Sequence, residues 1–160
     1  MKKIFVSAIT TLLLMIILAS TTFAAPTTSE RELLLKGSLK TTETQQAVFP
    51  TLFVSATGSG NATQLGLFTI SSQAQVNIPT LASSTSSTLV AADGSTLVGV
   101  GTGQGTPTAT PGIVSIVETY TITGGTDRFE GATGTFTVVR VLNRATGISS
   151  GTISGTIVLP

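Results

Sequence analysis

Apolar and polar residues alternate in one stretch of this chain, and this alternation limits the fold more than any other feature. In residues 65–78, Phe68 and Ile70 fall on one face of the stretch, while Thr69 and Ser71 fall on the other. A period of two residues is that of a β-strand with one face buried and the other in water. The stretch therefore predicts a strand of an antiparallel sheet that is wetted on one side.

Seven other runs rich in β-branched residues follow one another, with short breaks that contain turn-forming residues. Strands that each have one apolar face must bury those faces, by closing a barrel or by stacking two sheets. We expect one all-β domain with little helix, a single antiparallel eight-stranded β-barrel over residues 33–160. The expected strands are Leu33–Thr42, Ala47–Thr57, Leu65–Ile78, Thr85–Ala92, Ser95–Thr102, Ile113–Thr123, Thr135–Leu142 and Ile148–Leu159.

Glycine and proline predict the breaks between these strands. Asp93-Gly94 predicts a two-residue hairpin turn of type I′, because both residues tolerate the positive φ angles of that turn. The segment Gly101–Gly112, which contains two prolines, is expected to be a loop. Ser83–Thr88 is expected to be a loop that leads into a strand. Gly58-Ser59-Gly60 is expected to be a turn, since it neither opens a helix nor carries the lysine of a phosphate-binding loop.

The amino-terminal segment has the pattern of an export signal. Two lysines precede an apolar run from Ile4 to Ala19, and Thr22-Phe23-Ala24 forms a small-x-small cleavage site. We expect a signal peptide over residues 1–24, a flexible lead over 25–32, and a secreted or periplasmic protein without stable membrane insertion after cleavage. The alternative is a retained membrane anchor, because the apolar run approaches the length that spans a bilayer.

Composition excludes several classes of function. The chain has no cysteine and no histidine, so it lacks disulfides, a thiol nucleophile, an imidazole base and the usual transition-metal ligands. We expect no metal site and no cofactor. Without Lys2 and Lys3, six basic residues face seven acidic ones, a net charge of about −1. Nucleic acid is therefore not an expected partner. Aromatic residues make up only 5% of the chain, which argues against an outer-membrane barrel.

Two charged residues are predicted to meet inside the barrel. If Thr123 lies opposite Thr135 in a symmetric connection, Glu118 faces Arg140 on the apolar face of two neighbouring strands. A buried charge is costly unless an opposite charge and hydrogen bonds accompany it. The pair is either a structural ion pair that fixes strand register or a polar anchor at the base of a ligand cavity. A register slip of one residue would instead send one of the two to solvent. The candidate ligand-binding residues are Glu118, Tyr120, Arg140, Phe136 and Val138.

Three segments of the chain resemble known motifs. Gly124–Gly134, which reads GGTDRFEGATG, resembles the GGTGxFxxAxG segment of the dirigent and allene oxide cyclase barrel superfamily. Asp93–Leu97 is similar to the NGSTL hairpin of dirigent proteins. Ala56–Thr69 is similar to an ATGxGxxTxLGxxT stretch of bacterial secreted relatives of unknown function. The resemblance extends from Val54 to Ile157.

This resemblance implies an eight-stranded barrel with a cavity for a small hydrophobic molecule, and assembly as a homotrimer. Plant relatives cyclise a fatty-acid epoxide or steer the coupling of phenolic radicals, with acidic residues in the cavity. Here Asp127 replaces the third glycine of the motif, and most of the aromatic and acidic residues of the plant cavities are missing. Glu118 is the candidate catalytic residue that the resemblance leaves.

Three functions remain open from the sequence. The favoured one is a secreted non-catalytic β-barrel that binds a small hydrophobic molecule or acts as a surface module. An isomerase or cyclase of the allene oxide cyclase type, or a dirigent-like protein, would use Glu118 in the cavity. The third is a structural module whose barrel interior is filled by side chains. Five phenylalanines are expected to be in the core: Phe49, Phe53, Phe68, Phe129 and Phe136.

Overall fold

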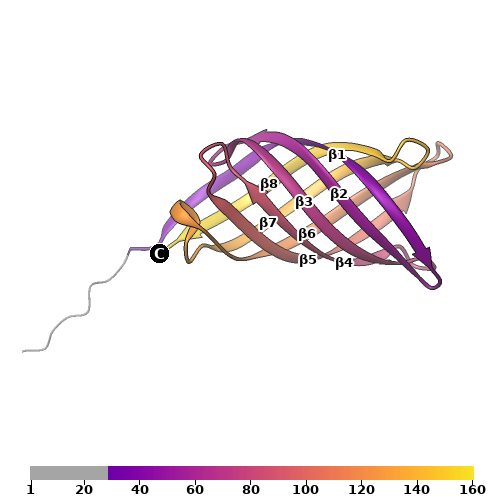
Figure 1. Ribbon diagram of the computed structural model, residues 1–160, viewed down its shortest axis with the longest axis horizontal. Coiled ribbons are helices and arrows are strands. Elements are labelled where there is room, and N and C mark those ends of the chain that lie inside the picture. The colour runs from indigo at the N-terminus through magenta and orange to yellow at the C-terminus, as the bar shows by residue number, and fades with distance from the viewer. Residues whose placement is uncertain (1–28) are drawn as a thin grey trace, which may run out of the picture.

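Eight antiparallel strands close into one barrel in the computed structural model, which describes residues 29–160 (Figure 1). Each strand pairs with the next one along the chain, and β1 pairs with β8 to close the sheet. The single eight-stranded antiparallel barrel expected from the sequence is therefore confirmed. The strands are β1 (Arg31–Val48), β2 (Thr51–Ala62), β3 (Gly66–Asn77), β4 (Ala82–Val90), β5 (Thr96–Pro107), β6 (Ile113–Gly125), β7 (Thr133–Asn143) and β8 (Ile148–Leu159), and a short 3₁₀ helix η1 (Asp127–Phe129) lies between β6 and β7.

The first strand is longer than expected at both ends. β1 begins at Arg31 rather than Leu33 and continues to Val48, beyond the expected end at Thr42. Arg31 and Glu32 thus belong to the barrel and not to a flexible lead. The expected signal peptide over residues 1–24, and the lead up to residue 28, lie outside the described residues. No helix within residues 29–160 has the length and apolar character needed to cross a membrane.

Three segments expected to be loops or turns form strands wholly or in part, and of the expected loop Gly101–Gly112 only residues 108–112 lie outside a strand. Residues 101–106 continue β5, residues 83–88 lie in β4, and residues 58–60 lie in β2. In β5 the glycines alternate with outward-facing residues and occupy the inner face, where small residues leave room for side chains from neighbouring strands. Pro107 is the last residue of β5, a position where the missing N–H costs no internal ladder bond.

The β4–β5 hairpin has a wider turn than the type I′ turn expected. Val90 pairs with Thr96, so five residues connect the strands. In this connection only Gly94 has a positive φ, of 90°, and its N–H donates to the carbonyl of Ala91 at 3.0 Å. The Asp93 carboxylate instead accepts a hydrogen bond from the Ser95 N–H at 3.1 Å. This side-chain bond and a backbone bond of 2.8 Å from the Ala91 N–H to the Ser95 carbonyl close the longer connection.

The register of β6 against β7 differs by two residues from the symmetric prediction. Glu118 pairs with Val138, and Arg140 pairs with Ile116. The last pair of this ladder is Thr121 with Thr135, where Thr123 was expected, and the connection beyond it contains η1. A shift of two residues preserves the face of every side chain, so Glu118 and Arg140 still lie inside the barrel as diagonal neighbours.

The interior places glycines opposite its largest side chains. Because a glycine has no side chain, its cross-strand partner can extend into the bore where two side chains would collide. A Cβ built at Gly101 would lie 2.1 Å from the backbone carbonyl oxygen of Thr119, and one at Gly155 would lie 2.7 Å from Cβ of Phe136. The pairs are Gly101 with Tyr120, Gly103 with Glu118, Gly151 with Arg140 and Gly155 with Phe136.

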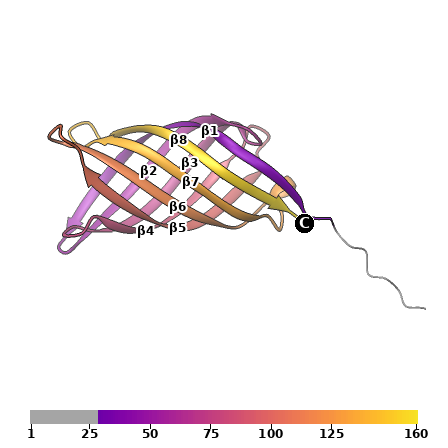
Figure 2. The same ribbon diagram turned by 180° about the vertical axis from the view of Figure 1, so that it is seen from behind.

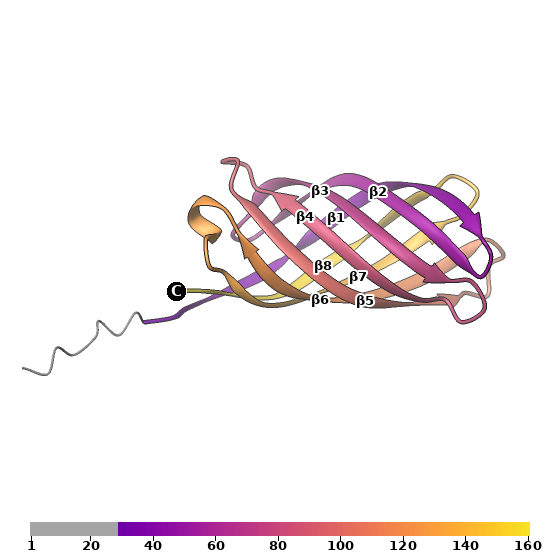
Figure 3. The same cartoon turned by 60° about the horizontal axis from the view of Figure 1, so that its bottom comes forward.

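The two ends of the barrel differ. Near the chain termini the bore is filled by a core that includes Leu35, Leu65, Leu97 and Phe129, each at most 1% exposed. Figures 2 and 3 show that β1 begins and β8 ends at this end of the barrel, with η1 near the carboxyl terminus. The β1–β2 and β7–β8 connections lie at the opposite end (Figure 3). The terminal end is therefore closed by side chains.

Three of the five phenylalanines expected in the core are there. Phe68, Phe129 and Phe136 are buried, whereas Phe49 is 78% exposed and Phe53 is 43% exposed. Phe49 lies in the β1–β2 turn, and Phe53 is an outward-facing residue of β2, so neither can reach the bore.

Candidate functional site

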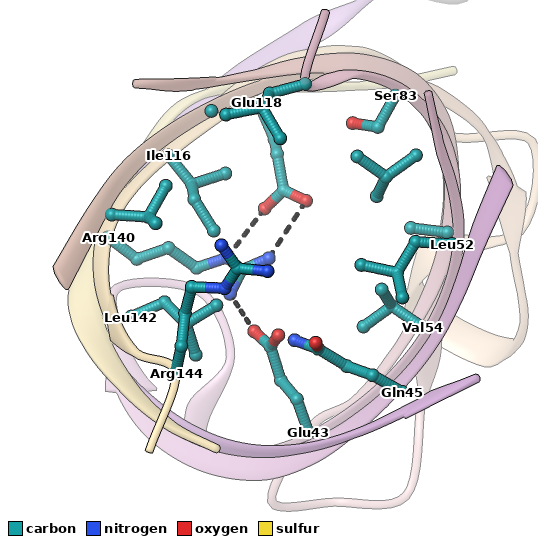
Figure 4. Close-up of a pocket in the computed structure, with 15 residues that line it drawn as sticks. Glu43, Gln45, Leu52, Val54, Ser83, Ile116, Glu118, Arg140, Leu142 and Arg144 are labelled. Carbon is teal, nitrogen blue, oxygen red and sulfur yellow. Dashed lines mark hydrogen bonds and ion pairs between the residues drawn. The ribbon is translucent and has the colours of Figure 1, made fainter. Parts of the chain in front are cut away.

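A pocket occupies the bore at the end of the barrel away from the termini. Its cavity volume is about 70 Å³, within a hollow of about 580 Å³ that includes space open to solvent at the mouth. The pocket is narrow, and Figure 4 shows it in a view along the barrel. Its apolar wall comes from four strands, β2, β3, β6 and β7, and from the β3–β4 turn: Leu52, Val54, Ala74, Val76, Leu81, Val114, Ile116 and Leu142.

The floor of the pocket is a buried ion cluster made of Arg140, Glu118 and Glu43. Arg140 on β7 donates from Nε to Oε2 of Glu118 at 2.9 Å and from Nη2 to Oε1 of Glu118 at 3.2 Å. Its Nη1 donates to Oε1 of Glu43 on β1. The side chains of Glu43 and Glu118 are 2% and 6% exposed, and that of Arg140 is 10% exposed. One guanidinium thus joins carboxylates from two other strands.

Two hydroxyl groups support the cluster from one side. Nη1 of Arg140 also donates to Oγ of Ser149 on β8 at 3.1 Å, and Ser149 in turn shares a hydrogen bond of 2.7 Å with the hydroxyl of Thr41 on β1.

The surroundings of Arg140 raise its pKa above the ordinary value of an arginine. Burial by itself lowers this pKa, but the hydrogen bonds and the electrostatic attraction from Glu118, and then from Glu43, have the larger effect. Arg140 is therefore held as a cation.

Glu43 is the member of the cluster that sequence analysis missed. It lies just beyond the expected end of the first strand at Thr42 and was therefore not among the candidate residues. In the structure β1 continues past it, and Leu35, Leu39, Thr41 and Glu43 all face inward. The alternation of these residues is a signal that could have extended the strand. No pattern within β1 could show that it would lie beside Arg140.

The mouth of the pocket carries a second arginine, Arg144. Arg144, in the β7–β8 turn, is exposed and also lines the pocket (Figure 4). Within residues 29–160, no carboxylate lies close enough to Arg144 to form an ion pair. A cation thus stands at the entrance above a floor that contains two carboxylates.

The other three candidate residues lie deeper than the pocket. Tyr120 stacks on Phe136 with ring centroids 4.6 Å apart, and both are at most 2% exposed, as is Val138. The hydroxyl of Tyr120 shares a hydrogen bond of 3.1 Å with Thr85. The structure thus brings Glu118 and Arg140 to the pocket and places these three in the packed layer beneath them. Their role in ligand binding stays a prediction.

The segment that resembles the GGTGxF motif lies at the closed end. Asp127, where the motif has its third glycine, has a φ of 53°, in the left-handed region that glycine favours. The Phe129 side chain, 1% exposed, closes the bore. Arg128 forms an exposed ion pair of 2.8 Å with Asp93 of the β4–β5 connection. The segment therefore closes the bore at the terminal end and is linked to the β4–β5 connection there. It does not line the pocket.

Acidic residues do not gather into a metal centre in the described part of the chain, where no three metal-ligating side chains of the His, Cys, Asp and Glu types lie together. The chemistry of the pocket floor is that of hydrogen-bond acceptors held around one guanidinium. Such a floor can accept hydrogen bonds from a bound molecule or attract positive charge.

Comparison with known proteins identifies the fold of this chain and no family. No protein-family model and no curated protein matches the chain. Among solved structures, that of a pterocarpan synthase dirigent protein matches with a TM-score of 0.58 and 14% sequence identity, covering 88% of this chain and 98% of the other. A likeness at this level of identity concerns the fold alone. The chain has the eight-stranded β-barrel fold of a dirigent-like protein.

Proposed function

We propose that this protein is an exported, non-catalytic binding barrel that holds the apolar part of a small molecule in the pocket opposite the termini. The observation that carries the proposal is an apolar wall around a buried ion cluster, in a barrel whose other end is filled. Binding pockets for small molecules commonly combine apolar walls with a few fixed polar groups. Apolar wall residues provide affinity, and the cluster orients one polar group of the ligand.

The fixed geometry of the floor supports this function. Arg140 binds both carboxylates, and Ser149 holds its Nη1 from the side, so these groups need little rearrangement when a ligand arrives. A floor whose side chains are already ordered loses little conformational freedom on binding. The side chains of the wall are short and branched, which also limits that loss.

The non-catalytic assignment rests on residue types and on the engagement of Glu118. The chain contains no histidine and no cysteine. Both carboxylate oxygens of Glu118 accept hydrogen bonds from Arg140, so this carboxylate is already engaged by a guanidinium of the protein. In the alternative, a dirigent-like or cyclase function, Glu118 would act as an electrostatic anchor. Unchanged turnover of an identified substrate in Glu118→Gln would exclude that role.

Two neighbouring residues of β6 provide a matched test of the binding site. Ile116 lines the pocket, whereas Val117 faces outward and is 44% exposed. We expect Ile116→Phe to fill the pocket and to weaken binding of the neutral probe naphthylmethanol by about tenfold or more, about 1.4 kcal/mol. Val117→Phe should bind as the wild type does. Isothermal titration calorimetry measures both, and far-UV circular dichroism checks that each variant keeps the barrel.

Two outcomes would contradict the proposal. One is equal loss or equal retention of binding in both variants, since the site would then lie outside the bore. The other is the absence of saturable binding to the wild-type protein for both naphthylmethanol and a slimmer alkyl alcohol. In the second case the barrel would be a structural module.

A further inference from the structure

We infer that the pocket selects an organic ammonium, a small amine with an apolar body whose cationic group lies beside Glu43. This inference rests on the proposed binding function and adds the chemical class of the ligand. It starts from the charges of the pocket floor. Two carboxylates and one guanidinium carry a formal charge of −1, and all three side chains are at least nine-tenths buried.

One carboxylate oxygen of Glu43 accepts no hydrogen bond from the residues that the structure describes. Arg140 donates to Oε1 of Glu43, while no hydrogen bond reaches Oε2 from any residue that the structure describes. By contrast, both oxygens of Glu118 accept a bond from Arg140. Glu43 lines the pocket, and Figure 4 shows its carboxylate pointing into the bore. An unused carboxylate oxygen, on a side chain that is 98% buried, therefore faces the space where a ligand would lie.

Charge balance favours an ammonium over the other polar groups of small molecules. An unpaired charge in a protein interior is costly, and an opposite charge with hydrogen bonds offsets that cost. An ammonium provides both, because it donates hydrogen bonds and carries a positive charge. A hydroxyl group could donate to Oε2 of Glu43 but would leave the excess negative charge. A carboxylate would add a second excess negative charge and is disfavoured.

The walls of the pocket limit the size of the ligand, and Arg144 at its mouth adds a positive charge that opposes the binding of a cation. The walls are apolar and the cavity is narrow, so the body of the amine is expected to be a slim alkyl chain or a flat ring system. Arg144 at the mouth lies on the path of entry and repels a cation. Because Arg144 is exposed, water and salt weaken this repulsion, and the buried floor dominates.

Three probes with the same ring system test the inference: naphthylmethylamine, naphthylmethanol and naphthoate. At neutral pH these are a cation, a neutral hydroxyl donor and an anion. We expect the wild-type protein to bind the ammonium about tenfold more tightly than the alcohol in calorimetry, and the carboxylate more weakly than the alcohol.

Three variants locate the source of the selectivity. Glu43→Gln should reduce the ratio of ammonium to alcohol affinity to about one, because the floor becomes a neutral pair. Glu32→Gln removes an equal charge from an exposed position of the same strand and should keep the wild-type ratio. Arg144→Gln should raise the ammonium affinity several-fold, because it removes the repulsion at the mouth.

The outcomes separate this inference from the proposed function. If the alcohol or the carboxylate binds as tightly as the ammonium, or if Glu43→Gln keeps the wild-type ratio, the ammonium preference is wrong while the binding barrel stands. If none of the three probes nor an alkyl alcohol binds to the wild-type protein, the binding function fails and the inference fails with it.

Discussion

Arg140 is the residue that connects the most distant parts of the interior. From β7 it donates to Glu118 on β6, to Glu43 on β1 and to Ser149 on β8. The partner on the adjacent strand could be predicted from the sequence, because alternation places Glu118 and Arg140 on the inner face of neighbouring strands. The partner on β1 could not, since its place depends on barrel closure and on the full length of the first strand.

Tyr120 gives the interior a pH dependence that can be measured. Burial, followed by the negative charge of Glu118, raises the pKa of Tyr120 from 10.0 to about 12. Between these two pH values the unfolded chain has lost the phenolic proton while the folded protein retains it. Stability therefore falls as pH rises through this range, by roughly 2 to 3 kcal/mol in total. Below pH 10 this contribution is constant.

Urea unfolding between pH 9 and pH 12 tests this dependence, with Tyr120→Phe as the comparison. The phenylalanine variant loses the hydrogen bond to Thr85 and is expected to be less stable at pH 9 by about 1 kcal/mol. It should lose less stability than the wild type as pH rises, because it has no phenol to ionise. Parallel curves for the two proteins would show that Tyr120 ionises as easily in the folded state as in the unfolded one.

At the scale of the element, β5 shows how the sequence makes room in the bore. Its inward positions Gly99, Gly101, Gly103 and Gly105 alternate with outward-facing residues. Read alone, a glycine repeat followed by prolines predicts a loop, since glycine weakens an isolated strand. The repeat forms a strand because β4 and β6 on either side carry the inward side chains that fill the space, including Tyr120 and Glu118. This reason is non-local and cannot be found in the segment itself.

Alanine substitutions at two glycines of β5 are predicted to differ in cost, because one glycine faces backbone atoms and the other faces side chains that can move. At Gly101 an added Cβ would lie 2.1 Å from the backbone carbonyl oxygen of Thr119, whereas at Gly103 it would meet side-chain atoms, Oγ of Ser83 at 2.6 Å and Cγ of Glu118 at 2.8 Å. Gly101→Ala should therefore destabilise by roughly 3 kcal/mol, and Gly103→Ala by roughly 1 kcal/mol. Urea unfolding checks the order, and a larger loss in Gly103→Ala would contradict the assignment of the strand's inner contacts.

At the scale of the whole molecule, one pairing turns a meander into a barrel. All other strand pairs join neighbours in the chain, and only β1 with β8 brings together distant segments. This pairing runs from Arg31 opposite Leu159 to Thr42 opposite Ile148. Closure was expected from the sequence because eight half-apolar strands need to bury their faces. The division into a filled end and an open pocket was not, because it depends on which inward side chains meet.

The proximity of β1 and β8 predicts that the chain order can be permuted. Because Arg31 and Leu159 are paired, a short Gly-Ser linker can join residue 160 to residue 30 at the closed end, far from the pocket. New termini between Ala109 and Thr110 fall in the exposed β5–β6 connection. We expect this permutant to fold with a stability within about 1 kcal/mol of the natural order, since loop-closure entropy changes slowly with length. Far-UV circular dichroism and urea unfolding measure it.

A second permutant with the same linker but new termini between Glu118 and Thr119 provides the control. That cut interrupts β6 beside the ion cluster, where the ladder bonds to β5 and β7 depend on a continuous strand. It should be much less stable than the loop permutant, because strand continuity and the placement of Glu118 are lost together. Equal stability of the two permutants would contradict this prediction. It would mean that an unbroken β6 is not needed to hold the pocket end of the barrel together.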